Sequence, residues 1–316
     1  MNIKKTILFL LVILIQGCSL TQDKDFGNQT QRLEQLSVEN RLIAEDLIKF
    51  IEDSDNKYFS WAGCINNDST AIDNNCLSNE NGNTSDETFI SDTKYSDFDV
   101  RVARGPVVEK IGRMNSEGKM TAPGRGEKRK LLWGRFYSID VHPKTPLVGM
   151  LHATLVLQIF EDGSIGTGGW LDVMPGTRVE SDIEYLRKVT DDYFKENNKD
   201  PSLYRRLVCK GTEETIFEFR RKPTCAGVSF YGPPVYRESG ELSYRFIKGM
   251  YSEFVDAYFE IIEERMDDPY TQEDLIAQEK MRKSWLIDQL FSDPFASKIV
   301  PFDVWATANV APTVKF

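Results

Sequence analysis

Histidine is scarce in this chain of 316 residues, which contains two copies, His142 and His152. Neutral imidazole is the commonest metal ligand and proton carrier near physiological pH, so these residues come first in any search for such chemistry. The five cysteines lack the C-x₂₋₄-C spacing that is typical of zinc sites. Basic residues are also in deficit, and the net charge of −10 argues against a partner with a phosphate backbone. A zinc-ribbon protein and a nucleic-acid-binding protein are therefore disfavoured.

A long apolar run occurs at the N-terminus. Lys4 and Lys5 precede apolar residues 7–15, a pattern typical of a secretory signal and too short for a membrane-spanning helix. The run ends in Leu14-Ile15-Gln16-Gly17-Cys18, which resembles the lipobox of bacterial lipoproteins. In that class the cysteine is lipidated, and Ser19 rather than Asp after it is typical of outer-membrane lipoproteins. We expect a signal peptide over 1–17, a tether over 18–29 and a lipid anchor at Cys18 that faces the periplasm; a plain signal peptide is the alternative.

Four cysteines lie beyond the predicted anchor. Export to an oxidising compartment favours disulfides, and the close spacings suggest the pairs Cys64–Cys76 and Cys209–Cys225. Four cysteines allow three connectivities, and buried free thiols are the alternative.

The middle of the chain alternates between apolar and polar residues with a period of two. Residues 131–142 and 150–160 each read as a half-buried antiparallel strand, and both histidines fall on the less apolar face. Asp162-Gly163 predicts a hairpin turn that leads into a further strand over 164–173. With a two-residue turn, Asp172 pairs with Ala153 and points away from His152, unless a bulge at Gly168-Gly169 restores the phase.

Helical spacing marks both ends of the domain. We predict helices over 30–51 and 242–266, and helices opened by capping boxes at Ser181–Glu184 and Thr271–Asp274. Residues 215–219 and 227–231 read as short strands. Strands between helices favour an α+β fold in which a large antiparallel sheet is flanked by helices on both faces. We expect a single domain over 30–316, with a polar surface insertion at about 62–97.

Several segments, taken in order, resemble the oxygen-dependent coproporphyrinogen III oxidases. Ser138-x₃-His142-Pro143-x₂-Pro146 followed by His152-Ala153 matches the strand–loop–strand signature of that family, and Gly168 to Pro175 resembles its GGG-x-DLTP turn. Residues 254–268 resemble a family helix, 311–316 its final strand, and 105–116 a weaker motif. The likeness covers most of the chain after about residue 100.

The resemblance implies a fold, a reaction and a site. The family has a large antiparallel sheet between helices, usually as a homodimer, and uses dioxygen, without flavin or haem, to convert two propionates of coproporphyrinogen III into vinyl groups. It implies His152 as the acid/base and Asp172 as the residue that grips the pyrrole NH groups; both roles suit the chemistry of these side chains. The residues expected to contact substrate are Ser138, His142, Thr154, Gly168 and Gly169.

This chain also departs from the family. Val156 stands where the family has an arginine, and Arg187, Glu218 and Pro294 stand near positions of other family histidines and an arginine. A substrate with four propionates needs cationic partners, so these differences bear on activity.

Two functions follow as expectations. The first is a lipid-anchored oxidase acting on coproporphyrinogen III or a related tetrapyrrole, with dioxygen as co-substrate and no cofactor. The second is a non-catalytic lipoprotein that binds a tetrapyrrole or an envelope partner; location outside the cytoplasm and the missing arginine favour it. For His142 and His152 the alternatives are structural hydrogen bonding and a two-histidine metal site, which lacks nearby carboxylates in the sequence.

Overall fold

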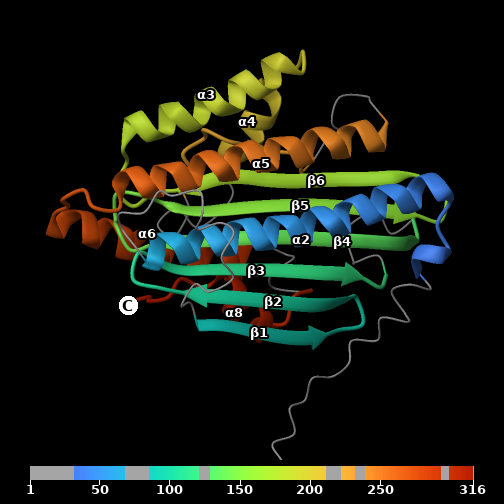
Figure 1. Cartoon of the computed structure of the whole chain (residues 1–316), viewed down its shortest axis with the longest axis horizontal. Helices are drawn as coiled ribbons and strands as arrows, with labels where there is room; N and C mark the ends of the chain where they lie inside the picture. Colours follow the sequence, from blue (N-terminus) through green and yellow to red (C-terminus); the bar gives the residue numbers. More distant parts are fainter. Residues whose placement is uncertain are drawn as a thin grey trace, which may run out of the picture.

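The fold was taken from a computed structural model that describes residues 32–67, 85–120, 129–210, 222–231, 239–292 and 299–315. One antiparallel sheet organises this part of the chain, with its seven strands in sequence order (Figure 1). The strands are β1 (Ser85–Asp92), β2 (Ser96–Arg104), β3 (Val108–Gly118), β4 (Leu131–Pro143), β5 (Met150–Phe160), β6 (Ile165–Met174) and β7 (Val228–Ser229). The expected α+β class with a large antiparallel sheet is confirmed.

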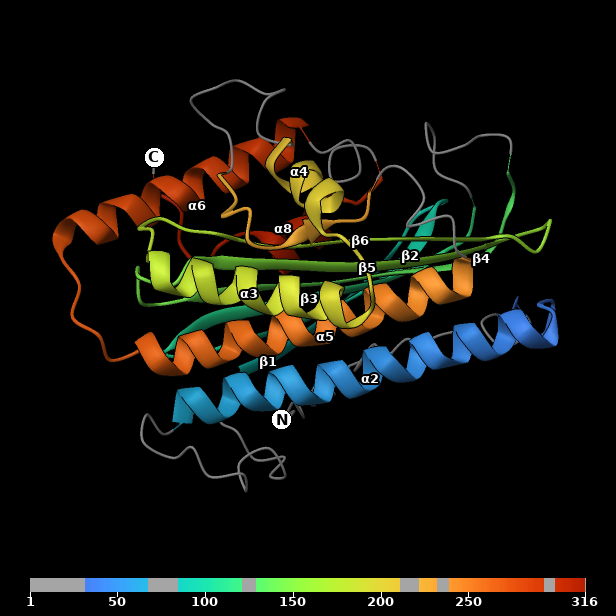
Figure 2. The same cartoon turned by 90° about the horizontal axis from the view of Figure 1, so that it is seen from above.

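Helices cover both faces of the sheet (Figure 2). On the apolar face lie α2 (Val38–Asn67), α3 (Glu180–Glu196) and α5 (Gly240–Arg265). On the opposite face lie α6 (Gln272–Ser292) and α8 (Phe302–Asn309), with α4 (Ser202–Lys210) beside the short strand β7. None of the helices in the described ranges is long and apolar enough to cross a membrane.

The apolar face follows from the period-two pattern. Trp133, Tyr137 and Ile139 of β4 are fully buried, and they pack with α2, α3 and α5 in the largest hydrophobic cluster. Burying apolar surface in this way is the main favourable term in folding. Polar contacts then align α2 with α5: Tyr58 Oη donates to Asp256 Oδ1 over 3.0 Å, and Trp61 Nε1 donates to Glu263 Oε1 over 2.7 Å.

The second face has a smaller apolar cluster where α8 docks on β2 and β3. Val304 and Trp305 of α8 are buried against Val100 and Val102 of β2. Close approach depends on Gly112 of β3, because a Cβ there would lie 1.9 Å from the carbonyl oxygen of Ala308. Helix α8 therefore rests directly on the backbone of the sheet.

Several local expectations were wrong. Helix α2 runs on to Asn67, and the expected surface insertion over 62–97 contains the end of that helix and the whole of β1. A favourable β pairing of β1 with β2 outweighs the polar composition that suggested a loop. Helix α3 begins at Glu180 with Val179 as its N-cap and no side-chain cap, so the predicted box at Ser181 does not form.

The capping box that the sequence predicts at Thr271–Asp274 forms. Thr271 caps α6, since its Oγ1 accepts from Asp274 N over 3.3 Å while Asp274 Oδ2 accepts from Thr271 N over 2.8 Å.

Residues 311–315 form no strand, in contrast to the expectation from the family resemblance. The predicted short strand over 215–219, like the signal peptide and tether, lies outside the described residues.

A disulfide joins Cys209 of α4 to Cys225, whose Cα atoms are 5.4 Å apart, as the spacing predicted. Cys64 is also disulfide-bonded, while Cys76 lies outside the described residues, so the pairing Cys64–Cys76 stays a prediction. Digestion of the full chain under non-reducing conditions should give one linked peptide pair containing Cys209 and Cys225 and a second containing Cys64 and Cys76. Mass spectrometry before and after reduction checks both pairs, and a Cys64–Cys209 peptide would contradict them.

Candidate functional site

The predicted site residues lie on one face of three adjacent strands. In the register of the sheet, Asp140 of β4 pairs with His152 of β5, and His152 pairs in turn with Asp172 of β6. Residues that pair directly across strands point to the same face, so these three side chains form a row. Ser138 and Thr154 pair in the neighbouring row on this face.

The predicted pairing of Asp172 with Ala153 is wrong, and the turn explains why. The hairpin loop holds three residues, because Phe160 N donates to Ser164 O over 3.0 Å and Gly163 N donates to Phe160 O over 2.9 Å. Gly163 has φ of +76°, the left-handed conformation that such loops place at their third residue. The extra loop residue shifts the register by one and brings Asp172 to the face of His152, with a continuous register across Gly168-Gly169.

His152 forms a hydrogen-bonded pair with Asp140. His152 Nδ1 lies 2.5 Å from Asp140 Oδ1, and the imidazole packs against the Trp285 ring of α6 with 5.1 Å between centroids. The histidine is 9% exposed and Asp140 1%. A carboxylate that orients one ring nitrogen leaves the other for proton transfer, which is the geometry of a general acid/base. The sequence placed Asp140 on the face of His142, but it did not indicate this pairing.

Asp172 is completely buried and its oxygens are occupied by its own chain. Its Oδ1 accepts from Val173 N over 2.8 Å and from the Thr224 hydroxyl, and its Oδ2 accepts from Cys225 N over 2.8 Å. Burial raises the pKa of Asp172 to about 6, although these hydrogen bonds act in the opposite direction. Asp172 thus anchors the segment that carries the Cys209–Cys225 disulfide.

Thr154 and Gly168 lie against Tyr231, whereas Gly169 lies against the backbone of Thr154. Thr154 Oγ1 is 2.9 Å from the Tyr231 hydroxyl and accepts from Trp170 N over 2.8 Å. A Cβ at Gly168 would lie 3.0 Å from the Tyr231 ring, whereas a Cβ at Gly169 would lie 2.6 Å from Thr154 O. A side chain of the protein therefore fills the space next to Thr154 and Gly168.

His142 lies on the same sheet face as His152, in the next row, two residues along β4 from Asp140. It is 1% exposed and pairs across the sheet with Lys110 of β3. Burial, with the positive charges of Lys110 and Arg282, holds the pKa of His142 well below its ordinary value. Burial likewise lowers the pKa of Lys110 to about 7. Lys110 and Arg282 are distant in sequence from the histidines, and no motif marked them.

In the ranges given above, no three or more His, Cys, Asp or Glu side chains come together as ligands for a metal ion. His152 instead uses Nδ1 for Asp140.

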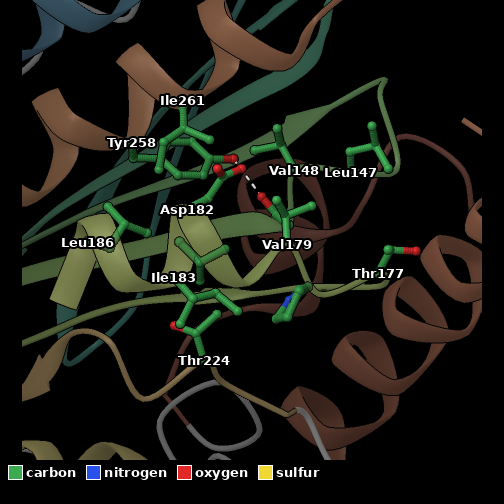
Figure 3. Close-up of a pocket in the computed structure, with 13 residues that line it drawn as sticks. Leu147, Val148, Thr177, Val179, Asp182, Ile183, Leu186, Thr224, Tyr258 and Ile261 are labelled. Carbon is green, nitrogen blue, oxygen red and sulfur yellow. Dashed lines mark hydrogen bonds between the residues drawn. The ribbon is translucent and has the colours of Figure 1, made fainter. Parts of the chain in front are cut away.

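A separate apolar cleft lies on the other side of β6, between α3, α5 and the β4–β5 loop (Figure 3). Most of its lining is apolar, with Leu147, Ile183 and Leu186 among the side chains that form it. None of the predicted site residues lines it, but Thr224 belongs both to its wall and to the hydrogen bonds of Asp172. Tyr258 closes another side and donates to Gly149 O over 2.7 Å.

Ser138, His142, His152, Thr154 and Asp172 thus lie together on one sheet face, at 9% exposure or less. Cys18 lies outside the described residues. When compared with models of known protein families, the chain matches none of them.

Proposed function

We propose that this protein is a lipid-anchored envelope protein of the coproporphyrinogen III oxidase fold that binds a tetrapyrrole without oxidising it. The anchor is the predicted lipid on Cys18 at the outer membrane, facing the periplasm. The sheet with helices on both faces agrees with that fold, and the residues with family counterparts gather on one face.

One observation carries the loss of the oxidase reaction. Asp172, which the resemblance assigns to the pyrrole NH groups, already accepts hydrogen bonds from Val173, Thr224 and Cys225 and has no exposed surface. Transferring these acceptors to a substrate would leave buried donors unpaired, at about 1–3 kcal/mol each. Val156, in place of the family arginine, is apolar and 8% exposed. Both features favour loss of the oxidase reaction.

The oxidase remains the second candidate, and the His152–Asp140 pair favours it. An imidazole oriented by a buried carboxylate, beside Asp172, is suited to moving a proton at a bound substrate. In that case each propionate side chain loses its carboxyl as carbon dioxide and gives up two electrons and a proton from the neighbouring carbon, and dioxygen takes up these electrons with protons and is reduced.

A turnover and binding assay separates these candidates. Purified full-length protein is incubated aerobically with coproporphyrinogen III, and products are separated by chromatography after oxidation to porphyrins. Binding of coproporphyrin III is followed in parallel by its visible absorption. We expect no protoporphyrin above the protein-free control, together with saturable binding that His152→Gln weakens.

Gln158→Ala is the matched control, because Gln158 lies on the same face of β5 and outside the row of His152. Formation of protoporphyrin that depends on His152 would establish the oxidase instead. Absence of both turnover and binding would contradict both candidates and leave a role in contacts with envelope partners.

A further inference from the structure

A buried cluster of cationic side chains lies next to the row of His152. We call Lys110, His142 and Arg282, with Glu109, the Lys110 cluster. Lys110 and His142 are paired on β3 and β4, and Arg282 reaches them from α6. Lys110 and His142 are 1% exposed and Arg282 5%.

Lys110 and Arg282 each have a structural partner. Lys110 Nζ donates to Val310 O over 2.6 Å, just beyond α8. Arg282 Nη2 donates to Glu109 Oε2 over 2.5 Å and to Pro143 O over 3.3 Å. The cluster therefore ties α6 and the end of α8 to the sheet.

Several donors in the cluster are unused. Nε of Arg282 has no hydrogen-bond partner in the part of the chain that the structure describes. Lys110 has three ammonium N–H groups, and Val310 O takes one of them. Buried donors without partners are uncommon in proteins, and they indicate a place for an acceptor.

The charges around the cluster indicate which acceptor fits. The positive charges of Lys110, Arg282 and Arg104 lower the pKa of His142. Of the carboxylates, Asp140 binds His152 and Glu87 lies near Arg104 at the surface. Glu109 alone among them hydrogen bonds to Arg282, and its side chain is 29% exposed. Glu109 is thus a carboxylate already bound in the cluster, at its solvent side.

We infer that the Lys110 cluster binds a carboxylate group of a ligand, which displaces Glu109 from Arg282 and uses the free donors of Arg282 and Lys110. The inference rests on the proposed function for the source of that carboxylate, a propionate of a tetrapyrrole. Guanidinium and ammonium groups are the usual partners of carboxylates.

Removing the Glu109 carboxylate, which competes with the ligand for Arg282, gives the sharpest test. Thermal unfolding of the full chain is followed with increasing sodium succinate, against sodium chloride at equal ionic strength. We expect succinate to stabilise the wild type, and Glu109→Gln to bind it about ten-fold more tightly because Arg282 is then unpaired. Lys110→Met should weaken the effect by a similar factor.

Glu279→Gln is the matched control, since Glu279 also lies on the α6 side of the molecule in an ion pair, with Lys315. If succinate stabilises Glu109→Gln against thermal unfolding no more than it stabilises Glu279→Gln, the inference is wrong. This comparison stands even if Lys110→Met fails to fold, because tighter binding cannot arise from simple destabilisation.

A second arm identifies the source of the carboxylate. Coproporphyrin III and its tetramethyl ester are titrated into the wild type and Glu109→Gln. Tighter binding of the acid alone by Glu109→Gln supports the inference and the proposed function together. Succinate binding without porphyrin binding supports the cluster and contradicts the tetrapyrrole proposal. Equal binding of acid and ester, unchanged by Glu109→Gln, overturns the cluster while leaving tetrapyrrole binding in place.

Discussion

Replacing Gly112 with alanine is expected to lower the free energy of unfolding by about 3–5 kcal/mol, because α8 can no longer dock on the sheet. The new Cβ would lie 1.9 Å from Ala308 O and 2.9 Å from Ala308 C. These are backbone atoms of a helix, so the whole of α8 must move. Its displacement exposes Val304 and Trp305, which are buried at 0% and 1% exposure.

Denaturant unfolding followed by circular dichroism measures the loss of stability, and hydrogen exchange measures protection over 302–309. Gly166→Ala is the control, because its Cβ would meet the Phe160 ring at 3.1 Å, and a ring edge can shift. We expect the control to unfold close to the wild type and α8 to lose protection in Gly112→Ala alone. Wild-type stability in Gly112→Ala would show that α8 does not rest on β3.

The second large effect concerns the pH dependence of stability through Asp172. Its pKa is raised from 3.8 to about 6 by complete burial. A pKa that is higher in the folded state makes the folded state hold its proton more strongly than the unfolded state does. The contribution to stability is therefore fully present below pH 3.8 and is lost as the pH rises through about 6.

Asp172→Asn removes this titration. The difference between the folded and unfolded pKa values means that the stability of the wild type relative to Asp172→Asn should fall by about 2 kcal/mol between pH 4 and pH 7. Chemical denaturation of both proteins across this range gives the difference. Asp267→Asn, the same change at an exposed site, should leave the slope unchanged. A difference between wild type and Asp172→Asn that does not vary with pH would contradict the burial of an ionisable carboxyl at this position.

The candidate site was partly readable in the sequence. Alternation along β4 and β5 placed His142 and His152 on the less apolar face, because side chains alternate in any strand whatever the rest of the fold does. The pairing of His152 with Asp172 was not readable, since it depends on one residue of loop length at Gly163.

The sequence did not indicate the partners of these residues. Asp172 is held by Thr224 and Cys225, 52 and 53 residues away in sequence, and Arg282 reaches Glu109 over 173 residues. Such contacts form between elements whose relative position depends on the packing of the whole sheet and its helices.

The sequence by itself determined the α+β class, the strands over 131–142 and 150–160, the face on which both histidines lie and the Cys209–Cys225 disulfide. These features depend on periodicity and spacing, which are local. Only the tertiary structure decided that α6 and α8 bury the polar face, that Asp172 is saturated by its own chain, and that Lys110 and Arg282 gather around His142. Burial and charge at a site are sums over residues from many elements, so they follow from the packing and not from any one stretch of sequence.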